Sequence, residues 1–79
     1  MPTKEEIEQE NQKLRYLKVL VYLSLNFIDQ TGLTLEEALA VVENVKRQAC
    51  RLFPGKEEAF EIIYRPRFNR LLKRKFGFH

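Results

Sequence analysis

Few residues in this chain could do covalent chemistry: one cysteine, Cys50, and one histidine, His79. A nucleophilic cysteine needs a neighbouring base that keeps it as the thiolate. His79 is the last residue of the sequence and is poorly placed to be that base. We therefore interpret Cys50, which follows Ala49 in an apolar pattern with helical spacing, as a small, half-buried apolar side chain.

Adjacent glutamates occur three times and could supply a general acid and a general base. The pairs are Glu5 with Glu6, Glu36 with Glu37, and Glu57 with Glu58. Each pair opens a predicted helix, where negative charge interacts favourably with the helix dipole, whereas acid–base catalysis needs carboxylates held in a cleft. The sequence also has no glycine-rich phosphate loop, no metal-ligand spacing and no serine–histidine–aspartate set. We predict no enzyme activity, catalytic residue, cofactor, metal site or small-molecule substrate.

A basic segment near the end of the sequence indicates a function most clearly. It has no acidic residue and holds six cations, namely Arg65, Arg67, Arg70, Lys73, Arg74 and Lys75. A helix here would present cations to the carboxylates of an acidic protein or to the phosphates of a nucleic acid. We predict that the electrostatic contact is made by Arg67, Arg70, Lys73 and Arg74. Phe68, Phe76 and Phe78 could stack on bases, but Phe68 and Phe76 also continue a leucine stripe that is typical of a core.

The elements that must position these side chains are helices. Glycine and proline divide the sequence into predicted helices at residues 4–30, 35–52, 56–64 and 66–76. Thr34 and Glu37 form a predicted capping box before the second helix, and Gly32 is expected to take a positive φ after the first. Pro66 is expected to begin the fourth helix, although the last two helices could also be one kinked helix. Within the second helix, Glu43 is expected to pair with a basic residue four positions later, Arg47.

These elements predict an all-α fold in a single domain of residues 1–79. The expected architecture is a small three- to four-helix bundle with a long N-terminal helix, a capped second helix and a proline-divided C-terminal segment.

The first helix has an unusually wide apolar face. At 100° per residue, the apolar side chains of residues 16–28 cover roughly 240° of its circumference, whereas a surface helix needs a stripe of only about 100°. A chain of 79 residues buries only about 60% of its unfolded surface, so a second chain is a natural cover for the excess. We predict a homo-oligomer, most simply a dimer, with an assembly face of Leu17, Leu20, Val21, Ser24 and Ile28. The alternatives are that these residues form an ordinary monomer core or meet an unlike partner.

Charge is distributed unevenly along the chain. Residues 1–40 carry a net charge of −3 and residues 41–79 carry +6, which leaves +3 overall. The longest apolar run is too short to span a bilayer and nothing resembles a signal peptide, so we expect a cytoplasmic protein. These features predict a non-enzymatic protein–protein interaction or adaptor module that self-associates and presents a basic C-terminal face to an acidic partner. The alternative is a nucleic-acid-binding accessory or regulatory protein, and a third possibility is peripheral binding to an anionic membrane.

Overall fold

The computed structural model describes residues 1–77, which form four α-helices and contain no strand. The helices are α1 (Lys4–Gln30), α2 (Leu35–Leu52), α3 (Glu57–Ile63) and α4 (Arg65–Phe76). The all-α bundle predicted from the sequence is therefore confirmed, with four helices. Phe78, expected as a possible base-stacking residue, and His79, considered as a base for Cys50, lie outside the described residues.

The first two helices begin where local sequence signals place them. The side chain of Thr3 accepts a hydrogen bond from the backbone N–H of Glu6 at 3.1 Å. The predicted capping box of α2 is complete: the N–H of Glu37 donates to Thr34 Oγ1 at 3.1 Å, and the N–H of Thr34 donates to Glu37 Oε1 at 2.9 Å. These bonds satisfy backbone donors that have no acceptor within the helix. The backbone N–H of Thr34 also holds the pKa of Glu37 below its ordinary value of 4.5.

The end of α1 differs from the expectation. Gly55 and Gly77 have positive φ values of 79° and 69°, but Gly32 does not. The helix instead ends at Thr31, which has an extended backbone with φ −112° and ψ 158°. The Thr31 hydroxyl donates to the carbonyl of Phe27, and the side chain of Lys75 donates to carbonyls at the same end. Because side chains satisfy these acceptors, the left-handed glycine that commonly ends a helix is not needed.

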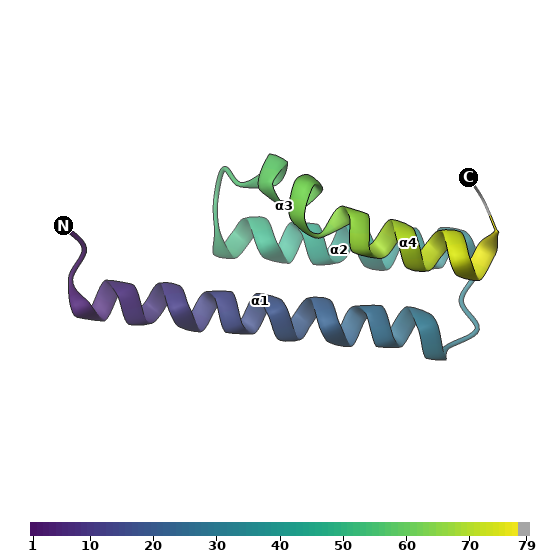
Figure 1. Ribbon diagram of the computed structural model, residues 1–79, viewed down its shortest axis with the longest axis horizontal. Coiled ribbons are helices and arrows are strands. Elements are labelled where there is room, and N and C mark those ends of the chain that lie inside the picture. The colour runs from purple at the N-terminus through teal and green to yellow at the C-terminus, as the bar shows by residue number, and fades with distance from the viewer. Residues whose placement is uncertain (78–79) are drawn as a thin grey trace.

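The C-terminal segment consists of two helices joined at Tyr64. Tyr64 has φ −103° and ψ −36°, so the chain stays near helical geometry while its direction changes (Figure 1). The expected start of α4 was one residue late: Arg65 is the first helical residue and Pro66 is the second. Proline is tolerated there because the N–H groups of a helix's first turn have no acceptor within the helix.

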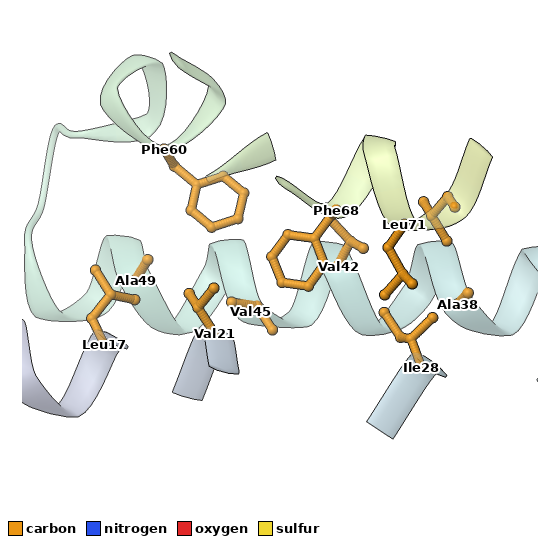
Figure 2. Close-up of a cluster of buried hydrophobic side chains, with 11 residues drawn as sticks. Leu17, Val21, Ile28, Ala38, Val42, Val45, Ala49, Phe60, Phe68 and Leu71 are labelled. Carbon is orange, nitrogen blue, oxygen red and sulfur yellow. The ribbon is translucent and has the colours of Figure 1, made fainter. Parts of the chain in front are cut away.

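The helices pack as a bundle in which α1, α2 and α4 each contact the other two around one apolar core. Figure 1 shows α2 running back along α1, and α3 and α4 returning over α2. As a result α4 runs in the same direction as α1, and its end lies beside the end of α1. Figure 2 shows the buried side chains between the helices. The core consists of Leu17, Val21, Ile28, Ala38, Val42, Val45, Ala49, Phe60, Phe68, Leu71 and Leu72.

The first helix is longer than the bundle that it supports. At a rise of 1.5 Å per residue, α1 extends about 40 Å and α2 about 27 Å. The core uses only residues from Leu17 to Ile28 on α1, and residues 1–12 are all exposed. Figure 1 shows this N-terminal part projecting beyond α2. We call residues 4–12 the N-terminal arm; it contains four glutamates and one lysine.

Candidate interaction surfaces

One face of α1 carries large apolar side chains that the bundle leaves uncovered. Tyr16, Val19, Leu23 and Phe27 are each 50–57% exposed, and Leu20 between them is half-buried. At 100° per residue these five residues lie within about 100° of arc and form one continuous line along the helix. We call them the apolar stripe.

The predicted assembly face shares only Leu20 with this stripe. Leu17, Val21 and Ile28 are at most 4% exposed and belong to the core of the subunit, as Figure 2 shows. Leu20 and Ser24 are half-buried, and Ser24 lies beside the stripe without belonging to it. The wide apolar arc of α1 is thus divided into an inner part that packs on α2 and α4 and an outer part that has no cover within residues 1–77. The sequence indicated the width of the arc, but not which part faces inward.

The stripe is large for the surface of a small protein. Two half-exposed aromatic rings and two half-exposed aliphatic chains present on the order of 400 Å² of apolar surface. A contiguous patch of this size on a soluble domain is typical of an interaction site, whereas scattered apolar residues are ordinary. At about 25 cal/mol per Å², covering this area would be worth about 10 kcal/mol before the entropic cost of association.

Arg65 is held in ion pairs between helices of the bundle rather than free on an interaction face. Its side chain is only 17% exposed and donates to Glu43 at 2.7 Å and Glu61 at 2.9 Å. The guanidinium also lies 5.7 Å from the centre of the Phe60 ring. Burial alone would lower the pKa of Arg65, but its hydrogen bonds with Glu43 and Glu61 outweigh that effect and raise it. Glu43 therefore pairs across helices, and the expected pair with Arg47 along α2 does not form.

Lys75 also points inward. Its ammonium group donates to the backbone carbonyls of Ile28, Asp29 and Thr31, with the last two at 2.9 Å and 2.8 Å. The last turn of α1 has no basic residue of its own, and a cation at a helix C-terminus is stabilising because the carbonyls there carry partial negative charge. Lys75 thus supplies from α4 the capping charge that α1 lacks.

The four remaining cations form the exposed basic face that the sequence predicted. Arg67, Arg70 and Lys73 are exposed and make no ion pair within residues 1–77. Arg74 is also exposed and donates to Asp29 on α1 at 3.3 Å. We call these four residues the basic face. It can bind carboxylates or phosphates through charge-assisted hydrogen bonds.

The aromatic residues of α4 are not free to stack on bases. Phe68 is fully buried and Phe76 is half-buried, because the apolar side of α4 completes the core. The same packing buries Leu71 and Leu72, so α4 cannot turn its apolar side toward a lipid surface without opening the bundle. Residues 1–77 contain no helix with the length and hydropathy needed to cross a membrane.

A shallow apolar groove lies where α1 leaves the bundle, and no pattern in the sequence predicted it. The groove has a volume of about 200 Å³, and its wall includes Leu14, Phe53, Phe60, Ile63 and Tyr64. Lys56 is its one charged lining residue, so it can seat an apolar side chain but offers no pair of catalytic groups. Helical periodicity did not indicate it, because it forms where residues of three helices meet.

Cys50 lies half-buried on α2 with its thiol free, as the sequence suggested. Comparison with protein-family models, with curated proteins and with solved structures yields no match. The two exposed surfaces, the apolar stripe on α1 and the basic face on α4, are therefore the features from which a function can be argued.

Proposed function

We propose that this protein is a non-enzymatic helical interaction module that self-associates through the apolar stripe of α1 and presents the basic face of α4 to an acidic partner. The observation that carries the proposal is the stripe, in which Tyr16, Val19, Leu23 and Phe27 are half-exposed while neighbouring residues of the same helix are fully buried. Exposing this apolar surface to water is unfavourable in free energy, and contact with a second subunit is the simplest way to bury it.

Sedimentation velocity over micromolar concentrations tests the self-association. We expect a concentration-dependent dimer for the native chain, and a shift to monomer for Leu23→Glu, which would bury a carboxylate in the contact. The matched control is Ile62→Glu, because Ile62 is 68% exposed on α3, away from the stripe. Helicity should persist in both variants, since neither residue is in the core. A native chain that is monomeric throughout, or equal effects of the two substitutions, would contradict the proposal.

The basic face supports the second part of the proposal through its unpaired charge. Arg70 and Lys73 are exposed on the outer side of α4, and an acidic protein segment could pair with them at little desolvation cost. Reversing both charges with Arg70→Glu and Lys73→Glu should abolish binding to a polyglutamate probe while leaving the fold intact. The matched control reverses Arg47 and Arg51, which are exposed on α2.

Nucleic-acid binding is the alternative use of the same face. Because Arg65 and Lys75 are engaged in contacts within the subunit, three or four cations remain to contact phosphates. A titration of duplex DNA at several salt concentrations should then give a log–log slope of about −3 to −4. Saturable binding with that slope would favour the nucleic-acid function, and its absence would leave the acidic protein partner.

A further inference from the structure

The apolar stripe has a symmetry along its own length. Four of its five residues run along the middle of its width, with spacings of four, three and four positions: Tyr16, Leu20, Leu23 and Phe27. Read in either direction, the order is aromatic, leucine, leucine, aromatic. A second copy laid antiparallel about the midpoint between Leu20 and Leu23 would place each aromatic ring against an aromatic ring and each leucine against a leucine. Such a two-fold contact satisfies the self-complementarity that a symmetric dimer requires.

The charges beside the stripe distinguish this arrangement from a parallel one. Arg15 and Asp29 lie on the same flank of the stripe, within about 40° of each other around the helix. In the antiparallel alignment, position 16 faces position 27, so Arg15 of one copy lies within one residue of Asp29 of the other, and the pair occurs twice. Arg15 is exposed and has no ion pair in the described residues. A parallel two-fold pair would instead place Arg15 of one copy on the opposite side of the contact from Arg15 and Asp29 of the other, so this ion pair would not form.

The ends of the molecule favour the same direction. In the antiparallel alignment the N-terminal arm extends past the partner's α1 by about 13 Å, the length of nine helical residues. The arm has a net charge of −3. The end that it reaches carries Lys73 and Arg74, because Lys75 ties the end of α4 to the end of α1. A parallel dimer would bring two acidic arms together.

We infer that the apolar stripe is covered by a second copy of this chain in an antiparallel dimer, with Tyr16 against Phe27, Leu20 against Leu23, and Arg15 beside Asp29. This inference rests on the proposed self-association and adds its direction and register. The stripe contributes on the order of 400 Å² per subunit, about half of the roughly 800 Å² that each partner buries in a standard interface. The flanking charges and the arm supply further contact area.

Dipolar electron paramagnetic resonance tests the direction of the two helices. Cys50→Ser leaves the chain without a native thiol, and Asn11→Cys places one spin label on an exposed arm position away from the stripe. The antiparallel dimer separates the two labels by about 32 Å along the helix axes, from 21 residues at 1.5 Å each. A parallel dimer holds them at the same height, within about 20 Å, or two helix diameters.

The outcomes separate the inference from the proposal on which it rests. A distance distribution centred beyond about 30 Å, in a sample that sediments as a dimer, supports the antiparallel arrangement. A short distance in a dimeric sample overturns the antiparallel arrangement and leaves self-association intact. A labelled chain that sediments as a monomer, with unlabelled protein also monomeric, overturns both.

A charge substitution at Arg15 tests the antiparallel register independently. Arg15→Glu should raise the dimer dissociation constant about five- to tenfold, because two ion pairs become two repulsions. Arg47→Glu is the matched control, since Arg47 is exposed on α2 and far from the stripe in the sequence. An unchanged or tighter dimer with Arg15→Glu would contradict the register, because a parallel contact loses no ion pair at that position.

Discussion

Lys75 and Lys73 stand two positions apart on α4, yet their ammonium groups have different surroundings. Lys73 is exposed and makes no ion pair among residues 1–77, whereas Lys75 bonds to three backbone carbonyls at the end of α1. Two cations of one basic segment can therefore differ in role: Lys75 stabilises the fold, while Lys73 remains free to bind a partner. Arg65 and Arg67 differ in the same way, because only Arg65 reaches Glu43 and Glu61.

Replacing Lys75 tests its capping role. Lys75→Met keeps the length of the side chain and removes its charge and donors, so we expect a loss of about 1–2 kcal/mol in the free energy of unfolding. Lys73→Met, the matched control, should change that free energy by less than about 0.5 kcal/mol. Urea unfolding followed by circular dichroism measures both. Equal values for the two variants would show that the contacts of Lys75 contribute nothing to stability.

The second helix owes its start to a local network that titrates. Glu37 is exposed, but its carboxylate accepts a hydrogen bond from the backbone N–H of Thr34 at 2.9 Å, and this bond lowers its pKa in the folded protein. A carboxyl group with a lower pKa in the folded state than in the unfolded state stabilises the fold above the unfolded-state pKa. That contribution is lost as the pH falls through the folded-state pKa.

A pH series on Glu37→Gln should reveal this contribution. The native chain should be more stable than the variant at pH 7, and the difference should shrink as the pH falls below about 4.5, because protonated glutamate resembles glutamine. Urea midpoints measured between pH 7 and pH 3 give the difference. A carboxyl ¹³C titration of Glu37 gives its pKa directly, and a midpoint at or above 4.5 would refute the interpretation.

The molecule as a whole consists of a compact helical bundle and one helix, α1, that is longer than the bundle. The principal extents are 47 × 22 × 16 Å, and the long dimension follows α1, whose arm projects beyond α2 in Figure 1. A free helical end of this kind gains little stability from packing, because isolated helical turns are marginal in water. Its acidic charge is consistent with a role outside the subunit, against a basic surface.

Removing residues 1–12 separates folding from association. In a Leu23→Glu background, which we expect to be monomeric, the truncation should change the free energy of unfolding by less than about 1 kcal/mol, because no core residue is lost. In the native background it should weaken the dimer, since the acidic arm no longer reaches the partner's basic end. Urea unfolding and sedimentation measure the two effects. A large loss of stability in the monomeric background would show that the arm belongs to the fold.

The positions of α1 and α2 were predictable from the sequence, because helix boundaries depend on neighbours along the chain. Thr34 and Glu37 form their box within one turn, and helical periodicity extends over each whole helix. The exposed basic face was predictable for the same reason, since alternation of apolar and charged residues on α4 orients it. The start of α4 was missed by one residue because the preference against a helical residue before proline is weak enough to yield to the contacts of Arg65.

The partners of the inward-facing charges and the buried side of α1 depend on residues that are distant in sequence. Arg65 reaches Glu43 across 22 positions and Lys75 reaches Ile28 across 47, so no local pattern distinguishes them from Arg67 or Lys73. On α1 the apolar arc is too wide for periodicity to choose an inner side. Packing against α2 and α4 buries Val21 in the core and leaves the stripe exposed, because only one sector of a helix can face its neighbours.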